Sequence, residues 1–305
     1  METNIKLKIC AGWTSSQEIT KRLLDQYNTS DIDLSNIEFV YDNTYDKIVF
    51  FNYVTEEVKE GTKSCVLFQE PTWSGSHQKN FSKTKNITVF GYEKNFYFCD
   101  NFVETPPMFL YGGRGPWCEG WNFWTYKNLT SSGFKKTKNI SSVVSNMGLY
   151  ENSFKEGCLY KERCNLINHL KSRVDFVDFY GWDCKTSNCK GQIKEKKDGV
   201  LNYRFSLCIE NANEKNYLTE KFLDCVLTDT IPIYYGCSNV EDLFDKRGFF
   251  HIEDINNLEE IQNLLDHINK NSEKLYQDML PYLQINKNKI FKEFNLLKKI
   301  VDFVL

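Results

Sequence analysis

The residues best suited to chemistry in this sequence lie around one predicted helix start. Thr219 is a good N-cap, which makes Glu220 and Lys221 the first two residues of that helix. The free N–H groups and the dipole at a helix start favour an anion, and Lys221 adds a positive charge beside them. Glu220 would repel a phosphate, but it is suited to accept hydrogen bonds from ribose hydroxyls. An ordinary capped helix with an acid in its first turn explains the same residues, so spacing alone leaves both interpretations open.

Further polar residues precede this helix. The largely apolar run 204–210 predicts a buried strand that delivers Glu210 and Asn211 at its carboxyl end, and Tyr217 lies in the loop that follows. Strand, loop and helix start, in this order, are how α/β proteins build sites for phosphate-bearing ligands. These groups can hold a sugar nucleotide, which makes the protein a candidate enzyme.

The elements that must position these residues follow from the apolar pattern. Alternating or apolar runs typical of strands recur along the chain, and amphipathic stretches typical of helices separate some of them. The predicted strands are 5–13, 37–42, 47–54, 64–70, 86–92, 108–113, 140–146, 174–183, 204–210, a run ending at Gly236, and 249–254. The predicted helices begin at Ser15 or Ser16 and at Thr219, and cover 160–170, 258–268 and about the last 30 residues.

This order of elements predicts an α/β protein of two domains, because a chain of 305 residues is long for a single core. We expect an N-terminal acceptor-side domain over 1–126, a linker over 127–139, a donor domain over 140–275 and C-terminal helices over 276–305. Two such domains are expected to hold a ligand in the cleft between them.

Composition narrows the class of protein. A net charge of -3 does not favour nucleic-acid binding, and 41% hydrophobic with 26% charged residues is typical of a globular protein. No apolar run approaches the ~18 residues that span a bilayer, and the N-terminus has no apolar signal segment. The 11 scattered cysteines favour free thiols in a reducing compartment, so we expect a cytoplasmic protein. Cys184 and Cys189 have no second pair at zinc spacing.

The stretch from Glu210 to Gly236 resembles the donor-binding signature of glycosyltransferase family 10, the α-1,3/4-fucosyltransferases. That signature is a strand ending in Glu-Asn, a variable loop, Tyr-(Val/Ile/Leu)-Thr-Glu-Lys, a helix, and a Pro-led apolar strand ending in Gly. In this sequence the matching residues, in order, are Glu210, Asn211, Tyr217, Thr219, Glu220, Lys221, Pro232 and Gly236.

The resemblance implies a GT-B fold, in which two Rossmann-like domains face each other across a cleft. It further implies an inverting fucosyltransferase of α-1,3 type that takes GDP-fucose as donor and a glycan as acceptor, without a metal or other cofactor. It also implies donor-binding roles for Glu210, Asn211, Tyr217, Glu220 and Lys221. Two alternatives stay open: the same mechanism with another nucleotide sugar, and an inactive relative that binds glycans or nucleotides.

Three upstream parts of the family pattern are recognisable as well. The family opens its donor domain with a Ser-Asn element, then an Arg on the next helix, then a strand of Val-Asp-x-Tyr-Gly type. Ser145-Asn146, Arg163 and residues 177–181 resemble these parts. A guanidinium suits bidentate binding of a diphosphate, so we expect Arg163 to contact the donor. A helix-surface arginine is the alternative.

The N-terminal half resembles the family less closely. The family places its general base, a Glu, just after an N-domain strand, and Glu70 follows the apolar run at 64–68. Inverting transfer needs a carboxylate that accepts the proton of the acceptor hydroxyl. Glu70 is therefore the predicted base, with Trp73 and His77 as weaker acceptor-binding candidates. The alternative is a solvated carboxylate at a strand end.

One further pattern has the spacing of a metal site. Asp31 and Asp33 form an Asp-x-Asp pair, by which other glycosyltransferases hold a divalent ion. The pair lies in a polar connection before a predicted strand, where a turn is expected instead.

Overall fold

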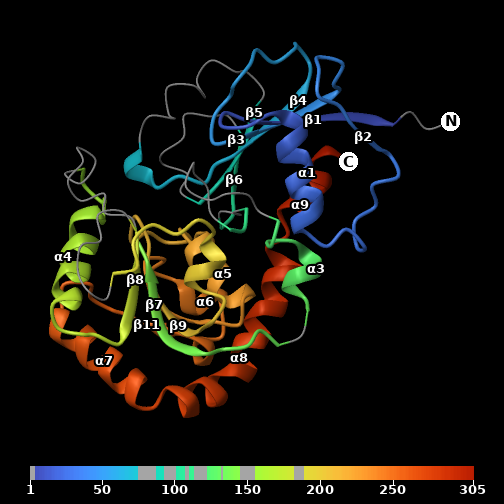
Figure 1. Ribbon diagram of the computed structural model, residues 1–305. Coiled ribbons are helices and arrows are strands. Elements are labelled where there is room, and N and C mark those ends of the chain that lie inside the picture. The colour runs from blue at the N-terminus through green and yellow to red at the C-terminus, as the bar shows by residue number, and fades with distance from the viewer. Residues whose placement is uncertain are drawn as a thin grey trace. The chain divides into compact units, whose positions relative to one another are not determined.

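The structure is a computed structural model that describes residues 4–74, 87–92, 101–106, 110–112, 122–131, 133–144, 155–181 and 189–305. It consists of two compact units (Figure 1). The first contains residues 1–110, 215–217 and 294–305, and the second contains residues 111–214 and 218–293. The predicted division into domains, linker and C-terminal helices at 126, 139 and 275 stays a prediction.

The first unit is built on a parallel sheet with the strand order β2-β1-β3-β4-β5-β6 among the residues described. Helix α1 packs on β1 and against α9, and a 3-10 turn, η1, follows β4. The elements are β1 (Ile5–Ala11), α1 (Ser16–Gln26), β2 (Ile37–Phe39), β3 (Lys47–Phe51), β4 (Lys63–Leu67), η1 (Thr72–Ser74), β5 (Ile87–Gly91), β6 (Asn101–Glu104) and α9 (Leu296–Val304).

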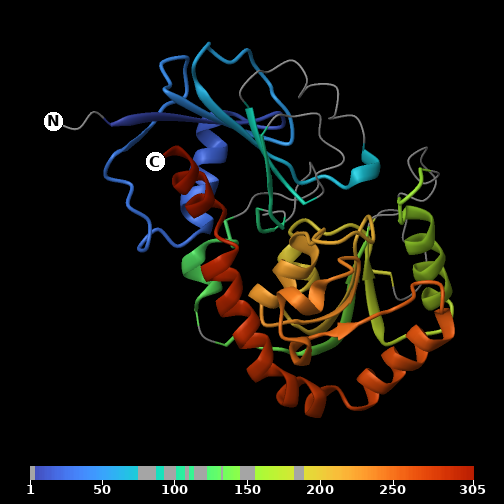
Figure 2. The same cartoon turned by 180° about the vertical axis from the view of Figure 1, so that it is seen from behind.

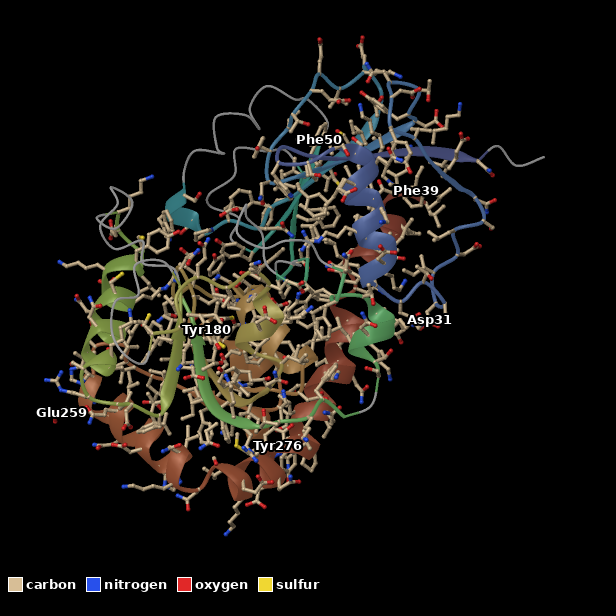
Figure 3. The ribbon with its side chains drawn as sticks, in the orientation of Figure 1. Asp31, Phe39, Phe50, Tyr180, Glu259 and Tyr276 are labelled. Carbon is tan, nitrogen blue, oxygen red and sulfur yellow. The ribbon has the colours of Figure 1, made fainter. Side chains whose placement is uncertain are left out.

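Apolar strand sequences explain the core of this sheet. Strands of a parallel sheet covered on both faces read as continuous apolar runs. The run of β3 is buried from Ile48 to Phe51, and Phe50 lies inside this unit (Figure 3). Helix α1 begins where the sequence predicts, because the Ser15 side chain accepts a hydrogen bond from the Glu18 N–H at 3.2 Å.

The second unit is built on a second parallel sheet, with the order β11-β10-β9-β7-β8 in the described ranges. The chain runs from β7 outward to β8 on one side, then returns to β9 and continues outward to β10 and β11 on the other. This is the 2-1-3-4-5 order of doubly wound proteins, which bind ligands beyond the carboxyl ends of the strands where the order reverses. Here that point lies between β7 and β9.

Helices cover this second sheet. Helix α8 packs against α5, β9 and β10, and α7 packs against α4; both views show α7 and α8 in succession along this unit (Figure 2). Tyr276 of α8 is buried in the same unit (Figure 3). The remaining elements are α3 (Tyr126–Leu129), β7 (Lys138–Val143), α4 (Tyr160–Lys171), β8 (Val177–Tyr180), η4 (Lys196–Gly199), β9 (Tyr203–Ile209), α5 (Glu220–Leu227), β10 (Ile231–Tyr235), α6 (Val240–Leu243), η5 (Lys246–Gly248), β11 (Phe250–His251), α7 (Leu258–Lys270) and α8 (Ser272–Glu293).

One predicted strand is wrong, and one strand of the first sheet was not predicted. In the predicted strand 108–113, the described residues 110–112 form no strand and include a turn. The last strand of the first sheet is instead β6, which the sequence analysis missed. Its four residues are largely exposed, as suits a short edge strand, so they carry little of the apolar pattern on which the prediction depends.

The described cysteines are mostly free thiols, as predicted, but Cys189 is disulfide-bonded, and for that residue the prediction is wrong. The free thiols are Cys10, Cys65, Cys158, Cys164, Cys208, Cys225 and Cys237. None of the helices in the described ranges combines the length and the apolar character that crossing a bilayer requires.

Candidate functional site

The centre of the candidate donor site is Glu210, which follows β9 and is completely buried. The Thr219 N–H donates to its Oε1 at 2.9 Å, and the Thr219 hydroxyl lies 2.8 and 2.7 Å from its two oxygens. Lys221 Nζ lies 3.1 Å from Oε2, and the Tyr234 hydroxyl donates to Oε1 at 3.3 Å. Glu210 therefore ties the end of β9 to the start of α5 and to β10. A direct contact with the donor stays a prediction.

Gly236 makes room for this carboxylate. A Cβ atom added at Gly236 would lie 2.3 Å from Cγ and 2.4 Å from Cβ of Glu210, closer than real carbon atoms approach. The glycine at the end of the motif is thus required by the close packing of the Glu210 side chain.

Lys221 and Glu220 occupy the first turn of α5, whose N-cap is Thr219 as predicted. The Lys221 side chain is 18% exposed, and its Nζ lies 3.5 Å from Glu220 Oε1. Burial alone would lower the pKa of Lys221, but the Glu210 and Glu220 carboxylates outweigh it and raise the pKa. The amine is therefore held protonated at the start of the helix, where it suits an anionic ligand.

Lys196 of η4 reaches the same helix turn. Its Nζ donates to the backbone oxygen of Glu220 at 3.2 Å and pairs with Asp224 Oδ2 at 2.6 Å. Burial opposes the charge on Lys196, but Asp224 and Glu220 raise its pKa. Burial raises the pKa of Asp224 to about 6, and the Lys196 ammonium beside it opposes that rise. Lys196 therefore joins η4 to α5 through the backbone oxygen of Glu220 and the carboxylate of Asp224.

Arg163 lies on α4 and is only 2% exposed, so the interpretation of it as a helix-surface arginine is wrong. Its guanidinium donates to Asn211 Oδ1 and lies over the Tyr160 ring at 5.3 Å. The Leu159 N–H, just before α4, donates to the Asn211 backbone oxygen at 2.9 Å. Arg163 and Asn211 are thereby joined beside β9.

The second unit thus brings together five of the predicted donor residues. They are Arg163, Glu210, Asn211, Glu220 and Lys221, and Arg163 is close enough that its charge opposes protonation of Lys221. They lie at the carboxyl end of β9, a strand that flanks the reversal point of the sheet. Two cations and a helix start can stabilise a diphosphate, and a partly exposed carboxylate can accept hydrogen bonds from ribose hydroxyls.

Tyr217 differs from the other predicted donor residues. It belongs to the first unit, is 2% exposed, and its ring lies 5.4 Å from the Tyr92 ring. These contacts show that Tyr217 packs in a core, and its contact with the donor stays a prediction.

Glu70, the predicted base, follows β4 in the first unit and is partly exposed. The Tyr92 hydroxyl donates to its backbone oxygen at 2.8 Å, and Asn52 Nδ2 donates to its Oε1 at 3.3 Å. The backbone and the carboxylate of Glu70 are thus held by different neighbours. Such a partly exposed carboxylate can accept a proton from a bound hydroxyl.

Of the two weaker acceptor candidates, Trp73 and His77, the structure describes only Trp73. Trp73 lies in η1, next to Glu70, and is partly buried. His77 lies outside the described residues, as does the predicted Ser145-Asn146 element.

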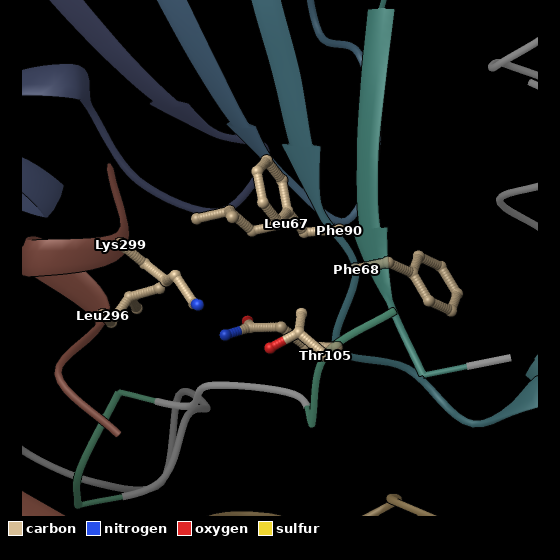
Figure 4. Close-up of a pocket in the computed structure, with 7 residues that line it drawn as sticks. Leu67, Phe68, Phe90, Thr105, Leu296 and Lys299 are labelled. Carbon is tan, nitrogen blue, oxygen red and sulfur yellow. The ribbon is translucent and has the colours of Figure 1, made fainter. Parts of the chain in front are cut away.

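A small pocket is lined in part by the residues that directly precede Glu70 in the sequence (Figure 4). It is lined by residues at the carboxyl ends of β4 and β5, by Thr105 after β6, and by two residues of α9. These residues are Leu67, Phe68, Gln69, Phe90, Thr105, Leu296 and Lys299. The lining is mostly apolar, so the pocket suits a small apolar group rather than a nucleotide.

The Asp31–Asp33 pair forms turns, as expected. The Ser35 N–H donates to Asp33 Oδ1 at 2.9 Å, and Asn28 and Ser30 donate to Asp31 at 3.4 and 3.3 Å. Within the described ranges, no group of three His, Cys, Asp or Glu residues is arranged to hold a metal ion.

Two residues near these sites were missed in the sequence analysis. Lys196 lies in a polar lysine-rich stretch, and no local pattern distinguishes it from a solvated lysine. Asn52 had a signal, since it directly follows the apolar run of β3 and asparagine readily adopts left-handed backbone.

Comparison with known proteins identifies the second unit. A family model described as "Glycosyltransferase family 10 (fucosyltransferase) C-term" matches residues 134–294, just over half of the chain. The match contains every residue of the candidate donor site in the second unit.

Two of the proteins that this chain resembles in sequence are fucosyltransferases. The α-(1,3)-fucosyltransferase FucT of Helicobacter pylori is 33% identical over 116 residues, which are 36% of this chain and 24% of that protein. The mouse 4-galactosyl-N-acetylglucosaminide 3-α-L-fucosyltransferase 9 is 36% identical over 75 residues, 24% of this chain and 21% of that protein. The matches thus span about a quarter of the length of these relatives.

Solved structures show the fold. An α1,3-fucosyltransferase with GDP superposes with a TM-score of 0.54 and 19% identity, over 98% of this chain and 91% of that chain. The T4 phage β-glucosyltransferase gives a TM-score of 0.54 with 12% identity, over 98% and 100%. The protein therefore has the predicted GT-B fold, with two parallel sheets, and the chain belongs to glycosyltransferase family 10, the fucosyltransferase family.

Proposed function

We propose that the protein is an inverting fucosyltransferase that moves fucose from GDP-fucose to a hydroxyl of a glycan, in an α-1,3 linkage. The observation that carries the proposal is the grouping of Lys221 and Glu220, at the start of α5, with Arg163 of α4. Family membership and a fold shared with a GDP-bound α1,3-fucosyltransferase add support.

The donor half of the mechanism follows from this cluster. Lys221, Arg163 and the N–H groups of α5 bind the diphosphate, and Glu220 accepts hydrogen bonds from the ribose hydroxyls. As the bond between the anomeric carbon and the phosphate oxygen breaks, negative charge grows on the diphosphate. Fixed cations stabilise that charge more in the transition state than in the bound donor. These side chains supply the charge that a divalent ion supplies elsewhere, so the proposal includes metal-independent transfer.

The acceptor half rests on Glu70. Its carboxylate takes the proton of the acceptor hydroxyl while that oxygen forms the new bond to the anomeric carbon. The electron pair of the old bond leaves with GDP, and the configuration inverts. Trp73 and His77 are proposed to contact the acceptor sugar, and Asn211 and Tyr217 the phosphates or the fucose.

Titration calorimetry with a panel of nucleotides tests the donor. We expect GDP and GDP-fucose to bind, and UDP and UDP-glucose to bind more weakly. Tighter binding of UDP-glucose than of GDP-fucose would indicate that the donor is not GDP-fucose. If no nucleotide binds, an inactive relative is supported instead.

A transfer assay tests the reaction. A 4-galactosyl-N-acetylglucosaminide is a suitable acceptor, because it appears in the name of the mouse relative. NMR of the product reports the linkage and the anomeric configuration, and an unchanged rate in excess EDTA is expected if no metal takes part. Retained configuration, or activity lost in EDTA and restored by a divalent ion, would contradict the proposed mechanism.

A further inference from the structure

Asn52 combines three unusual properties at the end of β3. It is 2% exposed, it is not a glycine yet has a φ of 65°, and its side chain bonds to two consecutive residues of another strand end. Its backbone N–H donates to Leu67 O at 2.9 Å, which continues the pairing of β3 with β4 by one residue. Left-handed backbone costs free energy at residues other than glycine, less so at asparagine than at most, and residues held in it are often found at functional sites.

The hydrogen-bond network determines the orientation of the Asn52 amide. The Gln69 N–H lies 2.8 Å from one end of the amide, and because a backbone N–H can only donate, that end must be Oδ1. The other end is then the NH₂ group, which faces Glu70 Oε1 at 3.3 Å. An N–H of the Asn52 amide, and not its oxygen, therefore faces the Glu70 carboxylate.

These contacts act on Glu70 in particular. The Tyr92 hydroxyl holds the backbone oxygen of Glu70, the Gln69 N–H anchors Asn52 next to it, and the Asn52 amide holds the carboxylate. Glycine would adopt the same backbone with less strain. It would leave the Gln69 N–H and the Glu70 carboxylate without these two bonds, so the side chain explains why asparagine suits this position.

We propose that Asn52 is a positioning residue for the general base, holding the Glu70 carboxylate in the orientation that receives the acceptor proton. This inference rests on the proposed function, in which Glu70 is the base. A carboxamide cannot take up a proton near neutral pH, so the proton from the acceptor remains on Glu70. Asn52 acts only through the orientation of that side chain, so its loss is expected to slow transfer without weakening donor binding.

The test compares Asn52→Asp with Asn52→Gly. Aspartate keeps the size, the tolerance of left-handed backbone and an acceptor for the Gln69 N–H, but it presents an oxygen instead of an N–H to Glu70. Glycine keeps the backbone and removes both bonds. We expect kcat to fall about 10- to 100-fold in both variants, because a misplacement of about 1 Å can cost up to about 100-fold. The KM for GDP-fucose and the Kd for GDP are expected to stay within about twofold of the wild-type values.

Asn257→Asp is the matched control. Asn257 also donates to a glutamate, with Nδ2 2.6 Å from Glu260 Oε2, but it is an exposed N-cap where aspartate serves equally well. We expect its kcat to equal that of the wild type.

A double variant separates positioning from general stability. If Asn52 acts through Glu70, Asn52→Asp should slow an enzyme that already carries Glu70→Gln by much less than it slows the wild type. Wild-type kcat in both Asn52 variants, or a fall in kcat matched by an equal loss of GDP affinity or of folded protein, would overturn the inference. If Glu70→Gln itself retains full activity, the proposed base is wrong and the inference fails with it. If Glu70→Gln is inactive while both Asn52 variants are fully active, the role of Asn52 is wrong and the assignment of Glu70 as the base is not contradicted.

Discussion

Each of the two units has a glutamate shortly after the carboxyl end of a parallel strand, Glu210 directly after β9 and Glu70 three residues after β4, yet the two side chains are in very different environments. Glu210 is completely buried and bonded to Thr219, Lys221 and Tyr234. Glu70 is partly exposed, and its carboxylate accepts a bond from Asn52. Burial, rather than position after a strand, thus distinguishes the two carboxylates: Glu210 is enclosed by its partners, whereas Glu70 keeps part of its surface exposed.

The same substitution at both positions gives the largest expected contrast in stability. Glu210→Gln removes the completely buried carboxylate from its pair with Lys221 and leaves Glu220 as the remaining carboxylate beside that amine, and removing one partner of a buried ion pair costs about 3–5 kcal/mol. Glu70→Gln should change the free energy of unfolding by less than about 1 kcal/mol, because partly exposed positions tolerate such changes. Urea denaturation of the two variants measures both values. Equal destabilisation would contradict the distinction between the two glutamates.

Glycine substitutions test whether the Glu210 network is as tightly packed as the distances indicate. Gly236→Ala is expected to destabilise the protein by about 2–4 kcal/mol, because overpacking adds to backbone strain. Gly133→Ala is the control, because Gly133 has a φ of 71° but nothing within 4 Å of the added Cβ. Strain alone should cost about 1–2 kcal/mol there. Thermal unfolding compares the two, and equal shifts in Tm would show that the region around Glu210 can relax.

The smallest of these effects concerns donor binding. Lys221→Met removes a charge-assisted contact of about 1.5–3 kcal/mol, so the Kd for GDP should rise about 10- to 100-fold. Binding of guanosine, which lacks the diphosphate, should change far less. Lys215→Met is the control, since Lys215 is 68% exposed and lies 3.9 Å from Glu104. If guanosine and GDP lose affinity equally, Lys221 acts on the fold of the site and not on the phosphates.

The donor segment was predictable because its signals are local. Thr219 caps a helix whose apolar face follows at once, and the helix begins where the sequence predicts. The burial of Glu210 was not predictable, since it depends on Tyr234 and Gly236, more than twenty residues further along the chain. Lys196 was missed for the same reason, because its partners are brought to it only by the fold.

The first unit was less predictable because its signals are weaker. The strands with buried apolar runs, such as β3 and β4, were found, whereas the exposed β6 was not. The contact between Asn52 and Glu70 depends on the register of β3 with β4, which pairs Phe51 with Leu67 and so sets Asn52 beside the residues that follow β4. Sequence alone predicts the strands but not that register.

The most direct test of the central claim is the transfer of fucose from GDP-fucose by the wild type and by Glu70→Gln, with GDP affinity measured in parallel. The account predicts that kcat falls by about 10²- to 10⁴-fold, the contribution of a general base, while the Kd for GDP stays unchanged. Full transfer activity in Glu70→Gln, or loss of GDP binding in that variant, would contradict the assignment of binding and proton transfer to the two glutamate-centred regions.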